Sequence, residues 1–104
     1  MQLLPNHAYF TRARGQAFIL RAGTDSELIE AELQHVEAGV PLNEGYECFF
    51  LLFLLPPGVV LQQATYRLTG PHGESLELLL TPIRPDDSGR NCLEAIVHRE
   101  KIRA

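Results

Sequence analysis

Few residues in this chain have the side-chain chemistry that a catalytic or metal site requires, and the histidines are the first to consider. His7, His35, His72 and His98 lie far apart in the sequence, and none belongs to an HxH or HExxH spacing. We therefore expect His72 to be an exposed turn residue, His35 to lie on a sheet face and His98 to lie at the rim of the last strand. The spacing predicts no metal site.

The two cysteines could act as nucleophiles only if a thiolate were stabilised beside a histidine and an oxyanion donor. Cys48 and Cys92 each begin an apolar stretch instead, and they belong to no CxxC spacing. This placement predicts buried structural thiols and is typical of a reducing compartment.

The carboxylates are numerous, and nothing selects a pair of them for acid–base work. They fall in residues 24–39, in turns and beside a hairpin: Glu27, Glu30, Glu32, Glu37, Glu74, Glu77, Asp86 and Asp87. The loop at residues 86–89 lacks the spaced oxygen ligands of a calcium loop, and residues 70–73 lack the lysine and following helix of a phosphate loop. We predict no catalytic residue and no cofactor, and hence no enzyme.

Composition limits the partners of the chain. Its 104 residues and 11.7 kDa correspond to one domain, residues 1–104, large enough to bury a core without disulfides or metals. The net charge is −4, and the densest basic stretch, residues 99–103, alternates with Glu100 and Ile102. A nucleic-acid partner is not expected, because that function needs a concentrated basic face.

A membrane partner is not expected either. The longest apolar run, residues 49–55, is seven residues long, whereas a membrane-spanning helix needs about 20. Residues 1–7 lack the charged and apolar regions of a secretory signal. The sequence therefore predicts a cytoplasmic protein.

Glycine and proline divide the chain into short pieces, which favours strands over long helices. We predict strands at residues 17–22, 48–55, 64–69, 75–83 and 92–98, with hairpin turns at residues 69–74 and 84–90. Residues 6–14 predict a short helical segment, with Asn6 as its cap, whose apolar side plugs one end of the sheet.

Residues 24–39 are ambiguous. As a helix they would begin with a capping box at residues 24–27, place Ile29, Leu33 and Val36 on one face, and end at Gly39. As a strand they would alternate Ile29, Ala31 and Leu33 with glutamate and glutamine, returning along residues 18–22. Periodicity alone slightly favours the helix.

The order of these features resembles a known family of bacterial domains of about 100 residues, catalogued as a domain of unknown function. The resemblance rests on residues 15–20, 50–53, 61–68, 76–83 and 93–99, and it covers nearly the whole chain. Four packing residues depart from the family pattern: Phe50, Ala64, Leu79 and Leu93. The resemblance implies an all-β domain and therefore a strand over residues 24–39. A weak association of the family with phage-tail-collar-like neighbours implies an accessory role in a tail-like or surface assembly.

The segment at residues 48–55 is apolar on both alternating faces, so one face needs a cover beyond its own sheet. The cover could come from residues 6–14, from another sheet or from another chain. In the last case the interface residues would be Phe49, Leu51, Phe53 and Leu55, with the aromatic side chains as anchors.

We predict an all-β domain of six or seven mostly antiparallel strands, barrel-like or a sandwich, with a short N-terminal helical segment. The predicted function is a non-catalytic protein-interaction or assembly module whose partner is another protein or a second copy of the chain. The alternative is a small barrel that binds an apolar ligand among Phe18, Leu52 and Leu78. The identity of any small-molecule ligand stays open.

Overall fold

The described part of the chain forms one short helix and six strands. The computed structural model describes residues 7–22, 27–40 and 44–100. In chain order the elements are α1 (His7–Ala13), β1 (Ala17–Ala22), β2 (Glu27–Ala38), β3 (Tyr46–Leu54), β4 (Ala64–Thr69), β5 (Ser75–Ile83) and β6 (Cys92–Glu100). The predicted helical segment is confirmed over residues 7–13, and its predicted cap, Asn6, lies outside the described residues.

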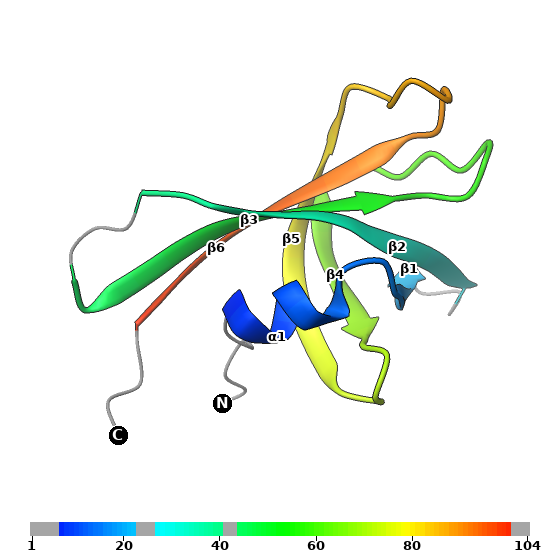
Figure 1. Cartoon of the computed structure of the whole chain (residues 1–104). Coiled ribbons are helices and arrows are strands. Elements are labelled where there is room, and N and C mark those ends of the chain that lie inside the picture. Colours follow the sequence, from blue (N-terminus) through cyan, green and yellow to red (C-terminus); the bar gives the residue numbers. More distant parts are fainter. Residues whose placement is uncertain (1–6, 23–26, 41–43, 101–104) are drawn as a thin grey trace.

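The strands close into a barrel. Each strand pairs antiparallel with its neighbours, in the order β1-β2-β3-β6-β5-β4, and the pairing of β1 with β4 closes the ring (Figure 1). The predicted class is confirmed, as are the predicted bounds of β1, β4 and β5. Strands β4, β5 and β6 are consecutive antiparallel neighbours, which is the meander that the two predicted hairpin turns require.

The hairpin turns are built by glycine and aspartate, as the sequence predicts. Gly73, between β4 and β5, has φ of +88°, and Gly89, between β5 and β6, has φ of +83°. Residues with a Cβ rarely adopt this left-handed region, which explains glycine at both turns. In the second turn the Asp86 carboxylate accepts hydrogen bonds from the backbone N–H groups of Ser88 and Arg90.

Residues 27–38 form a strand, and a bulge in it accounts for the helix-like spacing in the sequence. Leu33 lies opposite Phe53 on β3, but His35 lies opposite Leu52, so the pairing shifts by one residue at this point. Before the bulge Ile29 and Leu33 point inward, and after it Val36 does so. The phase shift converts strict alternation into the spacing of four and three residues that a helix face also shows. Residues 24–26 lie outside the described residues.

Side chains fill the interior of the barrel. The rings of Phe18 and Phe53 meet edge to face with centroids 5.4 Å apart, and Phe18 lies 6.3 Å from Phe10. The inward residues of every strand, and Leu55 directly after β3, belong to this one core: Phe18, Leu20, Ile29, Ala31, Leu33, Phe49, Leu51, Phe53, Leu55, Tyr66, Leu68, Leu76, Leu78, Leu80, Leu93, Ala95 and Val97. Leu52, which the ligand-binding alternative places inside, points outward and is half-buried. The interior therefore gives that alternative no support.

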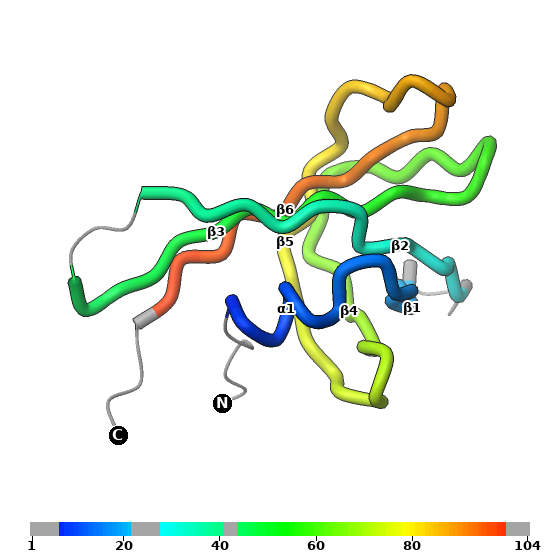
Figure 2. The backbone as a smooth tube through the Cα atoms, viewed as in Figure 1, coloured from blue at the N-terminus to red at the C-terminus, as the bar shows by residue number. Residues whose placement is uncertain are grey.

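Helix α1 covers an open end of the core. β2, β3 and β6 run side by side beyond the rest of the barrel, and α1 lies beneath them in the view of Figure 1 and Figure 2. Phe10, with no exposed surface, packs against Phe49 with ring centroids 5.6 Å apart and an angle of 49° between the rings, and the His7 ring lies 5.3 Å from the same phenyl ring. The helix thus supplies the cover that the apolar strand needs on its inner face.

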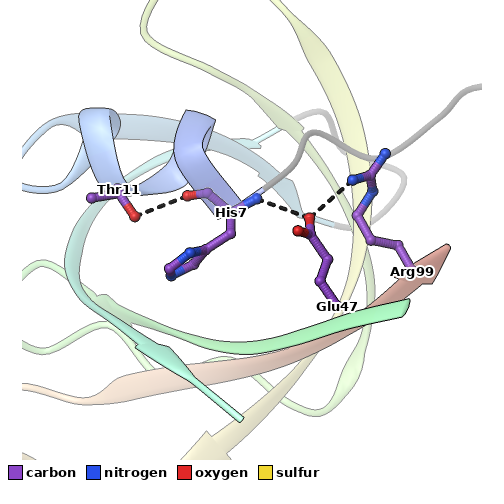
Figure 3. Close-up of polar contacts among 4 residues, drawn as sticks. All are labelled: His7, Thr11, Glu47 and Arg99. Carbon is purple, nitrogen blue, oxygen red and sulfur yellow. Dashed lines mark hydrogen bonds and ion pairs between the residues drawn. The ribbon is translucent and has the colours of Figure 1, made fainter. Parts of the chain in front are cut away.

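A polar contact holds the start of α1 to the extended strands. The backbone N–H of His7 donates to Oε1 of Glu47 on β3 at 3.1 Å, and Arg99 on β6 donates to the same oxygen at 2.9 Å (Figure 3). An α-helix leaves its first N–H groups without partners, so this carboxylate caps α1 from a distant strand. Glu47 and Arg99 are mostly shielded, with side chains 22% and 12% exposed.

Candidate functional site

The two faces of β3 have different environments, which corrects the predicted interface. Phe49, Leu51, Phe53 and Leu55 have no exposed surface, because the barrel interior and α1 enclose them. They are core residues of the single chain and present nothing to a partner. Of the alternatives for the cover of this strand, the structure shows the helical segment of the same chain, and it places these four side chains in the core and not at an exposed interface.

The alternate residues of β3 point outward and form an apolar surface with two neighbouring strands. Phe50 lies opposite Ile96 on β6, and Leu52 lies opposite Glu94. On its other side Glu94 lies opposite Thr81 of β5. Ile83 follows Thr81 by two residues on the same strand, so it points to the same side of the sheet, next to Leu52 and Glu94. We call Phe50, Leu52, Ile83 and Ile96, with the polar residues His35, Glu37 and Glu94 around them, the β3–β6 face.

The apolar members of the β3–β6 face are accessible to a partner. Ile96 is 62% exposed and Ile83 is 37% exposed, while Phe50 and Leu52 are half-buried. In the next cross-strand pair on the same side of the sheet, Leu54 and Cys92 are almost fully buried. Isolated exposed apolar residues are ordinary on proteins, but a contiguous cluster with polar residues around it is typical of an interaction surface.

The ring of Phe50 takes its position from a glycine. A Cβ at Gly39 would lie 2.9 Å from Cε2 of Phe50 and 3.0 Å from Sγ of Cys48, closer than side-chain atoms pack. The Gly39 N–H also donates to the carbonyl of Cys48 at 2.8 Å, which holds the end of β2 against β3. The absence of a side chain at residue 39 thus lets the phenyl ring of Phe50 lie close to the backbone of β2.

A hollow of about 340 Å³ opens in the centre of the β3–β6 face. Its lining combines apolar side chains with acidic groups: His35, Glu37, Phe50, Leu51, Leu52, Ile83 and Glu94. His35 Nε2 lies 3.7 Å from Oε2 of Glu37, at the edge of the hollow. Glu94 is half-buried, and no ion pair or hydrogen bond to its carboxylate occurs among the described residues. The hollow therefore offers apolar surface next to a negative charge.

The remaining histidines and the cysteines lie apart from this hollow. Across the β3–β6 ladder Cys48 lies opposite His98, whereas Cys92 lies opposite Leu54, so the two thiols are six pairs apart and cannot form a disulfide within the chain. Cys92 is buried as predicted, and Cys48 is half-buried. Burial is the largest cause that raises the pKa of Cys92, and the charge of Asp86 raises it further.

A second cluster of titratable groups lies where α1 meets the β4–β5 turn. Tyr9, Arg12, His72 and Glu74 line a hollow of about 310 Å³ together with Ala13 and Gln16. The Tyr9 hydroxyl donates to Glu74, and the His72 backbone N–H donates to the same carboxylate oxygen at 3.1 Å. This cluster uses its polar groups to fasten the helix to the turn.

The described residues contain neither a cluster of metal ligands nor a membrane-spanning helix. Over residues 7–22, 27–40 and 44–100, no group of three or more His, Cys, Asp or Glu side chains is placed to hold a metal ion. In the same ranges, no helix is long and apolar enough to cross a membrane.

Sequence reasoning missed Ile83, Glu94 and Ile96 as members of a surface. A signal was present in β6, where Ala95, Ile96 and Val97 are three apolar residues in a row. A strand with one solvent face alternates apolar and polar residues, so such a run indicates that its outward residue is also apolar. The pairing of Glu94 with Leu52 could not be predicted from such a run, because the two residues are 42 positions apart in the sequence.

The comparison with curated proteins and the comparison with solved structures gave no match. A family model does match, over residues 5–97, and so includes every strand except the last residues of β6. The resemblance to an uncharacterised domain family is thereby confirmed. The chain belongs to the family described as Domain of unknown function (DUF6916).

Proposed function

We propose that this domain is a non-catalytic protein-interaction module that binds a partner through the β3–β6 face. The observation that carries the proposal is the outward apolar cluster of Phe50, Leu52, Ile83 and Ile96 around a half-buried glutamate. Burial of such a cluster supplies the favourable free energy of association, at roughly 25 cal/mol per Å² of apolar surface removed from water.

The chemistry of the hollow defines the partner. Leu52 and Ile83 offer contact to an apolar side chain, and Glu94 beside them offers a carboxylate to a cation. A charge pair gains strength where binding removes water from around it. The partner we propose therefore presents an apolar side chain flanked by arginine or lysine.

We propose that the domain uses this binding surface as part of a larger protein assembly. A small barrel whose interior is filled by its own side chains offers rigid outer surfaces rather than an internal site. The antiparallel ladder between β3 and β6, nine residue pairs long, holds the backbone of the face in place. Preorganised surfaces of this kind bind with little loss of conformational entropy.

Selection of peptides on the immobilised domain tests this function. The probe is a library of random twelve-residue peptides displayed on phage, selected on the wild-type chain and counter-selected on Leu52→Lys. We expect the enriched peptides to combine a large apolar residue with arginine or lysine and to bind Leu52→Lys at least tenfold more weakly, a loss of about 1.4 kcal/mol. Val40→Lys is the matched control, because Val40 is 91% exposed and lies outside the face.

The selection can also contradict the proposal. Peptides that bind Leu52→Lys and the wild type equally well would show that another surface binds them. A library that yields no peptide with a preference for the wild type would leave the β3–β6 face without a binding function.

A further inference from the structure

The barrel carries a second surface on the side opposite the β3–β6 face. In the ring order β1-β2-β3-β6-β5-β4, the junction of β3 with β6 and the junction of β1 with β4 are three strands apart in either direction. The outward residues at these two junctions therefore point to opposite sides of the molecule. The charged side chains on the two sides are mainly of opposite sign.

A single cross-strand row at the β1–β4 junction combines an apolar side chain with two arginines. Leu28 on β2 lies opposite Arg21 on β1, Arg21 lies opposite Arg67 on β4, and Arg67 lies opposite Glu77 on β5. Leu28 is 60% exposed. We call these four residues the β1–β4 face.

The positive charge of this row is incompletely compensated. Like charges directly opposite each other on a sheet are unfavourable, and Arg21 and Arg67 form such a pair. Arg67 has an ion pair with Glu77 at 3.4 Å, but both side chains are more than half exposed, so this pair is weak. Arg21 has no ion pair with any side chain that the structure describes, and Glu30 lies one row away, opposite Ile19.

The shape of the β1–β4 face also suits a partner. A shallow groove of about 760 Å³ lies along it, lined by Arg21, Arg67, Glu77 and the consecutive residues 60–66. Within this groove Val60 is 76% exposed. Apolar side chains therefore project beside the two arginines.

We propose that the partner of the β3–β6 face is the β1–β4 face of a second copy of this chain, so that copies associate head to tail. This inference rests on the proposed function, since it names the partner of the same face. An exposed leucine flanked by arginine is the chemistry that the hollow beside Glu94 accepts. Pairing of two β3–β6 faces is disfavoured, because it would bring Glu37 and Glu94 of one copy against those of the other.

A head-to-tail interface does not limit the assembly to two copies. An interface between two different faces leaves one free face at each end, so association continues beyond the dimer into a ring or a chain of copies. A symmetric dimer would stop at two.

Two variants test the contributions of the two faces separately. Glu94→Arg places a cation in the hollow and repels Arg21 and Arg67, while Leu28→Glu replaces the projecting leucine with an anion that Glu94 repels. Leu28 is 60% exposed and Glu94 lines an open hollow outside the core, so each variant should fold as the wild type does. The controls are Glu44→Arg and Val40→Glu, which make the same kinds of change at exposed positions outside both faces.

Light scattering over a concentration series measures the outcome. We expect the wild-type mass to rise above twice the 11.7 kDa of the monomer, and each variant to associate at least tenfold more weakly. In an equimolar mixture of the two variants, the intact β1–β4 face of Glu94→Arg should bind the intact β3–β6 face of Leu28→Glu, so association should return to at least the dimer.

Other outcomes would overturn the head-to-tail inference and leave the proposed function separately testable. A wild type that stays monomeric at the highest concentration would do so, while the peptide selection could still identify the β3–β6 face as a binding site. Association weakened by Glu94→Arg but unaffected by Leu28→Glu would instead show a symmetric dimer. Association unaffected by Glu94→Arg would place the contact elsewhere.

Discussion

The hydroxyl of Tyr9 in α1 donates a hydrogen bond of 2.6 Å to Oε1 of Glu74 in the β4–β5 turn. Burial is the largest cause that raises the pKa of Tyr9 above its ordinary value, and the hydrogen bond and charge of Glu74 raise it further. The same hydrogen bond is the largest cause that lowers the pKa of Glu74. A Cβ at Gly70 would overlap both oxygen atoms, so glycine at this position permits the contact.

Removal of the Tyr9 hydroxyl should loosen the helix from the barrel. We expect Tyr9→Phe to lower the free energy of unfolding by about 1 kcal/mol, because a hydrogen bond to a carboxylate is lost while the aromatic ring stays packed. Urea unfolding measures this. Tyr46→Phe is the control, since no hydrogen bond to its hydroxyl occurs among the side chains that the structure describes, and an equal loss in both variants would refute the role of the Tyr9–Glu74 bond.

The cap that Glu47 provides for α1 should make stability depend on pH. Burial of Glu47 is the largest single influence and raises its pKa, but the hydrogen bonds from Arg99 and the His7 amide, with the charge of Arg99, outweigh it. The pKa of folded Glu47 therefore lies below its ordinary value of 4.5. Ionised Glu47 stabilises the fold above that pH, and the contribution is lost as pH falls through the folded pKa.

Glu47→Gln tests this dependence. We expect the wild type to exceed the variant in free energy of unfolding by about 1 kcal/mol at neutral pH. The difference should shrink as the pH falls below 4.5, where the wild-type carboxyl also becomes neutral. Chemical unfolding at several pH values measures it, and a difference that is the same at acidic and neutral pH would count against the cap.

The two faces of β3 should respond in opposite ways to truncation. Phe53 has no exposed surface, so Phe53→Ala leaves a cavity and should cost about 3–5 kcal/mol of stability. Leu52 is half-buried on the outer face, and Leu52→Ala should cost less than half as much. Thermal unfolding of the two variants gives the comparison. Similar losses of stability would contradict the assignment of Phe53 to the inward face of β3 and Leu52 to the outward face.

Sequence alone could predict the elements better than their orientation. Turn residues are local, so glycine and proline mark the bounds of β1, β4 and β5 correctly. The strand state of residues 27–38 depends on pairing with β1 and β3 on both sides, which local propensity does not contain. The bulge between Leu33 and His35 then conceals the alternation that would identify a strand.

The site was less predictable than the fold, for a physical reason. Residues 48–55 are apolar on both faces, so alternation cannot show which set points inward. The inward set is decided by α1, whose Phe10 and His7 cover Phe49, and by the register with β6. These are contacts between distant parts of the chain, and Glu94 joins the hollow only through the same register.

Gly39 should control the shape of the β3–β6 face. Gly39→Ala places a Cβ 2.9 Å from the Phe50 ring, so the ring must move outward, and we expect weaker binding of the selected peptides with a stability loss of about 1 kcal/mol or less. In the background of Phe50→Ala the same change should have no effect on binding, since the obstructed ring is gone. Equal effects of Gly39→Ala in both backgrounds would contradict this relationship.

NMR can locate the surface of the domain that binds a peptide, and so tests directly whether the β3–β6 face is a binding site. The sample is the Leu28→Glu variant, in which the opposite face is blocked, titrated with a peptide from the selection. We expect the largest changes in amide chemical shift at Phe50, Leu52, Ile83, Glu94 and Ile96. Largest changes at α1 or at residues 60–66, with the β3–β6 face unchanged, would contradict it.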